Sequence, residues 1–149
     1  MPMLRRLYNW IAIKDDVAPS ALDSKKSPTA KRKLGNSGED HALALLKKRG
    51  DKFVARNWSC KSGELDLVTW AGETLVFTEV RTRSGTEFGT PAESVTPWKQ
   101  ERIRRAAHGF LVRHCKDGRL PCCRYDVVWI VSNKNGEIVD SGIIEGAFV

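Results

Sequence analysis

The chain has 149 residues, which is enough for one domain with a buried core. Hydrophobic residues make up 41% of it and charged residues 29%, as in soluble globular proteins, and no apolar run is long enough to cross a membrane. The net charge is +7, but +5 of it lies in residues 1–34, so the pI alone argues only weakly for a nucleic-acid partner.

Residues 1–34 are predicted to be a basic, flexible extension. They are rich in Asp, Ser, Pro and Lys and show no apolar period, which is typical of disorder. The globular domain is predicted to span residues 35–149. Its first element is a helix over residues 37–49, where Asn36 and Glu39 form a capping-box pattern and apolar side chains recur at helical spacing.

Three strands are predicted next, over residues 52–59, 63–70 and 74–81. The middle strand alternates strictly between polar and apolar residues, as a half-buried strand does. The sequence Ala-Gly-Glu at residues 71–73 is typical of a hairpin turn, so the second and third strands should be antiparallel neighbours.

Residues 82–95 are predicted to form a loop containing glycine and proline. Thr96 then caps a helix over residues 97–115, which has a proline at its first position and an apolar stripe. Two further strands, over residues 124–131 and 137–144, complete the order α-β-β-β-α-β-β. This order predicts an α/β fold in which a central mixed sheet is flanked by helices.

Acidic side chains on the second and third strands should meet. Period two puts Glu64 and Asp66 on one face of their strand and the leucines beside Asp66 on the other, while Glu79 and Arg81 share a face of the next strand. If the two polar faces coincide, three acids repel one another unless a cation neutralises them. Oxygen-only ligands favour Mg²⁺ or Mn²⁺, which can polarise a phosphodiester and activate a water. The alternative is an outward-facing polar surface in which Arg81 simply pairs with Glu79.

Two more polar residues lie on the inward sides of the predicted helices. Gln100 opens the apolar stripe of the second helix, so it either holds a water or phosphate at the site or bonds to backbone at the edge of the core. Glu39 of the first helix either joins the acids or serves only as the capping-box acid.

The second predicted helix is the one dense basic element of the domain. A solvated helix face is one interpretation of its charges, and a rim that contacts phosphates is the other. Trp98 and Trp70 could stack on bases, although such aromatic residues more often anchor packing. The residues of the proposed nucleic-acid rim are Arg83, Lys99, Arg102, Arg105 and Arg113.

A series of motifs follows in order along residues 35–145. They resemble the YraN-like family of bacterial proteins, uncharacterised protein family 0102. The resemblance implies a restriction-endonuclease-like fold, similar to archaeal Holliday-junction resolvases, with an acid–acid–lysine nuclease signature. The motifs are Gly38-Glu39, Arg56-Asn57, Gly63-Glu64-Leu65-Asp66-Leu67-Val68, Val76-Phe77-Thr78-Glu79-Val80-Arg81, Phe88-Gly89, Pro91-Ala92-Glu93-Ser94-Val95, Lys99-Gln100, Arg104-Arg105-Ala106-Ala107 and Arg124-Tyr125-Asp126-Val127-Val128.

The resemblance also implies roles for single residues. Asp66 and Glu79 would bind the metal, Glu39 would be the acid supplied by the first helix, and Gln100 the polar residue of the following helix. Arg81 stands where the signature has lysine. Arginine keeps its proton and cannot act as a base, but it can orient a water or stabilise phosphate charge.

Three functions are compatible with these features. The first is a Mg²⁺- or Mn²⁺-dependent endonuclease, with branched or damaged DNA favoured over RNA as its substrate. The second is a nucleic-acid-binding module that keeps the fold without turnover, and the third is a protein-interaction domain. No membrane partner is expected, and a homodimer would suit a symmetric junction. The four cysteines make no Cys-x-x-Cys pair and are interpreted as reduced thiols of a cytoplasmic protein.

Overall fold

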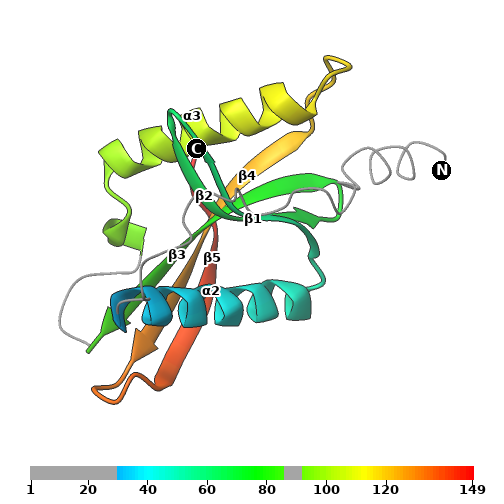
Figure 1. Ribbon diagram of the computed structural model, residues 1–149. Helices are drawn as coiled ribbons and strands as arrows, with labels where there is room; N and C mark the ends of the chain where they lie inside the picture. The colour runs from blue at the N-terminus through cyan, green and yellow to red at the C-terminus, as the bar shows by residue number, and fades with distance from the viewer. Residues whose placement is uncertain (1–29, 86–91) are drawn as a thin grey trace.

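The computed structural model describes residues 30–85 and 92–149, which form a five-stranded mixed sheet with two helices (Figure 1). Within these residues, neither helix has both the length and the apolar character that crossing a membrane requires. The predicted order α-β-β-β-α-β-β is confirmed, with a short 3-10 helix added before the second helix. The elements are α2 (Ala30–Arg49), β1 (Lys52–Cys60), β2 (Gly63–Ala71), β3 (Thr74–Ser84), η1 (Ala92–Ser94), α3 (Pro97–His114), β4 (Cys122–Ser132) and β5 (Ile138–Phe148).

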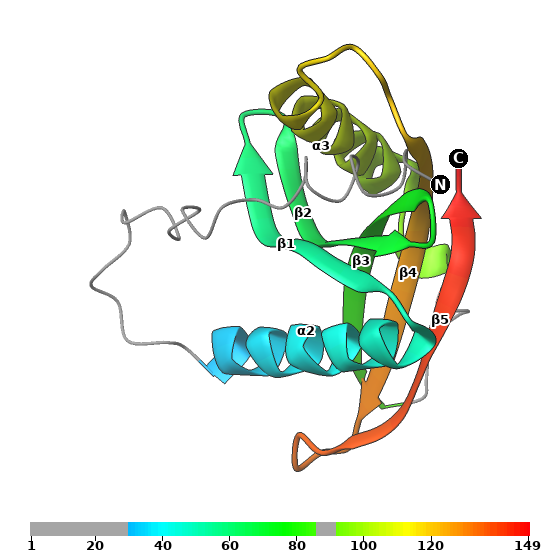
Figure 2. The same ribbon diagram turned by 90° about the vertical axis from the view of Figure 1, so that its right-hand side faces the viewer.

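The strands follow one another across the sheet in sequence order. Neighbouring strands are antiparallel except for β3 and β4, which are parallel and are joined by a crossover through α3. Figures 1 and 2 show α2 and α3 on opposite faces of the sheet. The buried side chains divide in the same way, into a large apolar cluster under α3 and a smaller one under α2.

The two helices differ in how well their starts are predicted. The start of α3 is confirmed, because the Thr96 hydroxyl accepts a hydrogen bond from the Lys99 amide and a proline occupies the first helical position. The start of α2 is not, because this helix begins at Ala30 and Asn36 lies inside it. The capping-box prediction is therefore wrong. Of the predicted extension, residues 1–29 lie outside the described residues and residues 30–34 begin α2.

The strict alternation predicted for β2 is broken at Asp66. Leu65 packs into the cluster under α3, whereas Leu67 packs into the cluster under α2. The register of β1 and β2 places Asn57 opposite Asp66, and Asn57 has a left-handed backbone with φ of 51°. A left-handed residue turns the strand and re-aims its side chains. The prediction of one shared face for the two leucines is therefore wrong, and Figure 2 shows the ends of β1 and β2 rising along α3.

The predicted loop over residues 82–95 is shorter in the structure. β3 continues to Ser84, and η1 occupies Ala92–Ser94. Residues 86–91 lie outside the described residues.

α2 approaches the sheet closely at Gly38, which is buried. A Cβ atom added to Gly38 would lie 2.5 Å from Oγ1 of Thr82 in β3 and 3.6 Å from Cδ1 of Ile130 in β4. The absence of a side chain therefore sets the distance between helix and sheet. Because Glu39 follows directly, this distance also sets how near its carboxylate comes to the strands.

A buried ion network joins the end of α2 to β4 and β5. The carboxylate of Asp126 accepts hydrogen bonds from Arg124 at 2.8 and 2.9 Å, from Arg49 at 2.9 Å and from the Gly146 amide at 3.0 Å. Arg49 also forms a two-bond fork with Asp51. Burial acts to raise the pKa of Asp126, but these hydrogen bonds hold the pKa below its ordinary value. At Gly146, where φ is 57°, the pairing of β5 with β4 is irregular.

We expect Gly38→Ala to destabilise the protein by about 1–3 kcal/mol, because the added methyl group meets Thr82. Urea denaturation measures the loss. Gly109→Ala is the matched control. Gly109 also lies inside a helix, but its added Cβ would lie 3.4 Å from Sγ of Cys60, which is an ordinary van der Waals contact. Equal unfolding midpoints for Gly38→Ala and the wild type would contradict the close approach.

Candidate functional site

The acidic site lies where β2 leaves β3. The ladder between them ends at the pair of Leu67 and Thr78, whereas β2 goes on pairing with β1 as far as Gly63. Directly beyond this point, Oδ2 of Asp66 accepts a hydrogen bond of 2.8 Å from the amide of Val80 in β3. Because β2 no longer pairs with β3 at Val80, this amide has no carbonyl acceptor in the sheet and needs another acceptor. The hydrogen bond fixes the Asp66 carboxylate beside β3.

Glu79 of β3 is the second acid, and its side chain is only 4% exposed. Its Oε1 lies 3.4 Å from Nζ of Lys99 in α3 and 3.7 Å from Nη1 of Arg81. The sequence assigns Lys99 only to the basic rim, whereas in the structure its ammonium group lies beside Glu79. The helical spacing of the sequence contains this information. Lys99 precedes the buried Ile103 by one helical turn, so it lies on the side of α3 that faces the sheet.

The charges of these acids are only partly compensated. Burial, and then the negative charge of Glu79, raise the pKa of Asp66 to about 7. The Val80 amide and the Lys99 ammonium act in the opposite direction, but more weakly. Asp66 therefore titrates near neutral pH and not in the acid range of an ordinary aspartate.

Glu39 approaches from α2, on the other side of the sheet. Its Oε2 accepts hydrogen bonds from Nε of Arg56 at 3.1 Å and from Nδ2 of Asn57 at 3.0 Å. Its charge also acts to raise the pKa of Asp66, so the two carboxylates are within electrostatic reach. Arg56 forms a second ion pair with Asp40. Arg56 and Asn57, for which the sequence predicts no individual role, thus orient the third acid.

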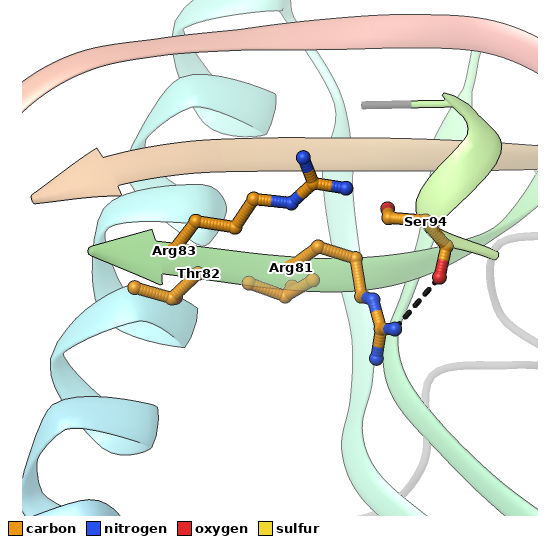
Figure 3. Close-up of a pocket in the computed structure, with 5 residues that line it drawn as sticks. Arg81, Thr82, Arg83 and Ser94 are labelled. Atoms are coloured by element: carbon orange, nitrogen blue, oxygen red, sulfur yellow. Dashed lines mark hydrogen bonds between the residues drawn. The ribbon is translucent and has the colours of Figure 1, made fainter. Parts of the chain in front are cut away.

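Arg81 turns partly away from the acids. Its Nη2 donates a hydrogen bond of 2.7 Å to the backbone carbonyl of Ser94, just before α3. A pocket of about 360 Å³ lies here, lined by Arg81, Arg83 and Ser94 together with Val80 and Thr82. Figure 3 shows both arginine side chains extending from β3 toward Ser94. The pocket therefore carries two guanidinium groups next to the acidic site.

Two other predicted polar residues have contacts of their own. Nε2 of Gln100 donates a hydrogen bond of 3.0 Å to the carbonyl of Val95, which is the backbone-bonded alternative that the sequence left open. Glu64 is exposed and pairs with Ser59 of β1, beyond the last contact of β2 with β3. The cluster expected from the sequence thus holds Asp66 and Glu79 without Glu64.

The predicted basic rim is divided. Lys99 lies beside Glu79, Arg83 lines the pocket with Arg81, and Arg102 stacks over the ring of Trp98 at 4.9 Å. Arg105, in contrast, pairs with Glu101 on the exposed face of α3. Arg113 lies in the last turn of α3, about 20 Å from Lys99 along the helix axis.

The donor set suits a small divalent ion held mainly by two carboxylates. Among the described residues, no group of three or more His, Cys, Asp and Glu side chains converges in the manner of a full metal cluster. Mg²⁺ usually needs only one or two carboxylates, with waters and substrate phosphates completing its shell. Asp66 and Glu79 match this requirement, because their mutual repulsion would fall when a cation binds.

We expect Asp66→Asn to stabilise the protein at pH 8 but not at pH 5. Between pH 4 and pH 7 the folded chain keeps a proton on Asp66 that the unfolded chain has lost, because its pKa is raised to about 7, so stability falls as the pH rises. Asparagine removes this cost and can still accept the Val80 hydrogen bond. Its melting temperature should exceed that of the wild type by about 3 °C or more at pH 8.

Glu64→Gln is the control for this experiment, because Glu64 is exposed on the same strand. Its melting temperature should follow that of the wild type at both pH values. An Asp66→Asn difference of the same size at pH 5 and pH 8 would contradict the raised pKa.

Known relatives match most of the chain. The model of a family described as uncharacterised protein family UPF0102 matches residues 38–130. A UPF0102 protein of Caldicellulosiruptor saccharolyticus is 42% identical over 79% of this chain and 98% of its own length. Another, from Herminiimonas arsenicoxydans, is 48% identical over 71% of this chain and 83% of its own length. The chain belongs to uncharacterised protein family UPF0102.

Proposed function

We propose that this protein is a divalent-metal-dependent nuclease with a restriction-endonuclease-like fold. The single observation that carries the proposal is the acid pair: a backbone amide holds the partly buried Asp66 beside the buried Glu79, and the pKa of Asp66 is raised to about 7. A protein gains no stability from such a pair. Strongly perturbed acids of this kind are typical of functional sites.

The surroundings of the pair favour phosphodiester hydrolysis over other metal chemistry. Arg81 and Arg83 line a pocket beside the acids, and Lys99 approaches Glu79 from α3. Guanidinium and ammonium groups bind phosphate oxygens and stabilise the charge that develops on a phosphate during hydrolysis. The substrate is therefore proposed to be nucleic acid, with DNA favoured and a branched form as the first candidate.

In this proposal each charged residue has one task. A bound Mg²⁺ or Mn²⁺ supplies Lewis-acid activation of the phosphate and of a water. Asp66 and Glu79 hold the ion, and Glu39 lies within electrostatic reach as a third acid. Lys99, whose ammonium group lies beside Glu79, stabilises phosphate charge. Arg81, anchored to the Ser94 carbonyl, orients the phosphate.

A second candidate is a nucleic-acid-binding module without turnover. One observation favours it: Lys99 pairs with Glu79, and Arg56 with Glu39, so two of the three acids have a cationic partner of their own. In that case the basic residues bind phosphates and the acids only set their positions.

Cleavage of labelled DNA separates the two candidates. The wild type should nick a four-way junction in the presence of Mg²⁺ or Mn²⁺ and not in EDTA. Asp66→Asn and Glu79→Gln should lower the rate by at least about two orders of magnitude, which corresponds to about 3 kcal/mol of transition-state stabilisation. Glu64→Gln should retain the rate. Equal cleavage by the wild type and Asp66→Asn would rule out this site.

Binding of Mn²⁺ should be about tenfold stronger at pH 8 than at pH 6. The ion requires Asp66 without its proton, and a pKa of about 7 leaves roughly a tenth of the molecules in that form at pH 6 and nine-tenths at pH 8. Calorimetric titration measures both affinities. Asp66→Asn should give no binding heat, and equal affinities at the two pH values would contradict the assignment.

Lys99→Met should slow single-turnover cleavage by about a hundredfold or more while leaving Mn²⁺ affinity equal or higher. The variant removes a charge that lies 3.4 Å from Glu79 and competes with the ion. Lys116→Met, at an exposed lysine beyond α3, is the control and should cleave normally. An unchanged rate for Lys99→Met would assign the role to another residue.

A further inference from the structure

Trp98 is exposed at the start of α3. Its side chain is 67% exposed, whereas Trp70 is 4% exposed and belongs to the core under α3. The sequence left open whether these two residues pack or stack, and the structure separates them. Packing in the core therefore explains Trp70 but not Trp98, whose ring is available for contact with a ligand.

The ring of Trp98 is also held in place by a cation. The guanidinium group of Arg102 lies 4.9 Å from the ring centroid, one helical turn further along α3. This contact covers part of the ring with a positive charge. Together, Trp98 and Arg102 form an exposed aromatic surface beside a group that can bind phosphate.

The position of this pair relative to the acids is fixed by the helix. Trp98 directly precedes Lys99, whose Nζ lies 3.4 Å from Glu79. Trp98 and Lys99 lie in the first turn of α3, which is 18 residues long. This first turn contains no acidic residue. No acid of the first turn itself offsets the positive end of the helix dipole, which further favours a polyanion here.

We propose that Trp98 and Arg102 form a stacking platform for an unpaired nucleobase of the substrate. The ring of Trp98 stacks on the base, and Arg102 contacts the adjoining phosphate. A base inside an intact duplex has both faces covered by its neighbours, so only a single-stranded or unstacked nucleotide can use the platform. This inference rests on the proposed function and narrows it, because it assigns substrates that carry unpaired nucleotides next to the acid pair.

Fluorescence anisotropy with a labelled oligothymidine of about 15 nucleotides tests the platform. The measurement is made in EDTA, so that cleavage does not interfere, and is repeated with a duplex of equal length. Trp98→Ala should weaken binding of the single strand about tenfold and change duplex binding by less than about twofold. Trp98→Phe, which keeps an aromatic face, should retain most of the single-strand affinity.

Val112→Ala is the matched control, because Val112 is 65% exposed on the same helix and lies about 21 Å from Trp98 along its axis. It should bind both probes as the wild type does. Unchanged single-strand affinity for Trp98→Ala, or an equal loss for both probes, would overturn the platform. So would a lower sedimentation mass for Trp98→Ala than for the wild type, since Trp98 would then be a contact between protein chains.

The platform and the nuclease proposal fail in different ways. If Asp66→Asn cleaves as the wild type does while Trp98→Ala still loses single-strand affinity, the acid site is wrong and the platform stands. If Asp66→Asn abolishes cleavage while Trp98→Ala binds normally, the nuclease stands and the platform is wrong.

Discussion

The site depends on one hydrogen bond, between the amide of Val80 and the carboxylate of Asp66. Where β2 turns away to follow α3, β3 loses its backbone partner, and a partly buried amide without an acceptor would cost up to about 1–3 kcal/mol. Asp66 supplies the acceptor. The same bond holds a negative charge beside Glu79, in surroundings that do not favour it. The local requirement of the sheet and the chemistry proposed for the site are thus met by one side chain.

Two aspartates of the sheet show how differently the fold treats charge. Asp126 is surrounded by two arginines and a backbone amide, and its pKa is lowered. The pKa of Asp66 is raised, first by burial and then by the charge of Glu79, and the single lysine nearby only partly offsets these two effects. The ion network of Asp126 holds the end of α2 to β4. The charge of Asp66 is unfavourable in the free protein, and a bound cation would stabilise it. Asp66 is thus the candidate for function, and Asp126 belongs to the framework.

Most of the fold could be predicted from local patterns, but the detail of the site could not. Thr96 and the proline after it locate α3, and the hairpin turn predicts that Asp66 and Glu79 lie on neighbouring strands. The left-handed backbone of Asn57 has no reliable pattern in the sequence, so the divergence of β2 from β3 and the exclusion of Glu64 were not foreseen. The place of Lys99 follows from its spacing to the buried face of α3, but only once that face is known to cover the acids.

The irregular pairing at Gly146 has a consequence for how the protein behaves at high concentration. β5 is an edge strand, and a straight edge offers its free backbone groups to a second chain. Here the left-handed glycine bends the edge, and its amide is already engaged by Asp126. Glu145 next to it is held by Arg49 and Arg124 and keeps a charge on the border of the sheet. This border is therefore a poor template for strand addition, which disfavours aggregation through β5.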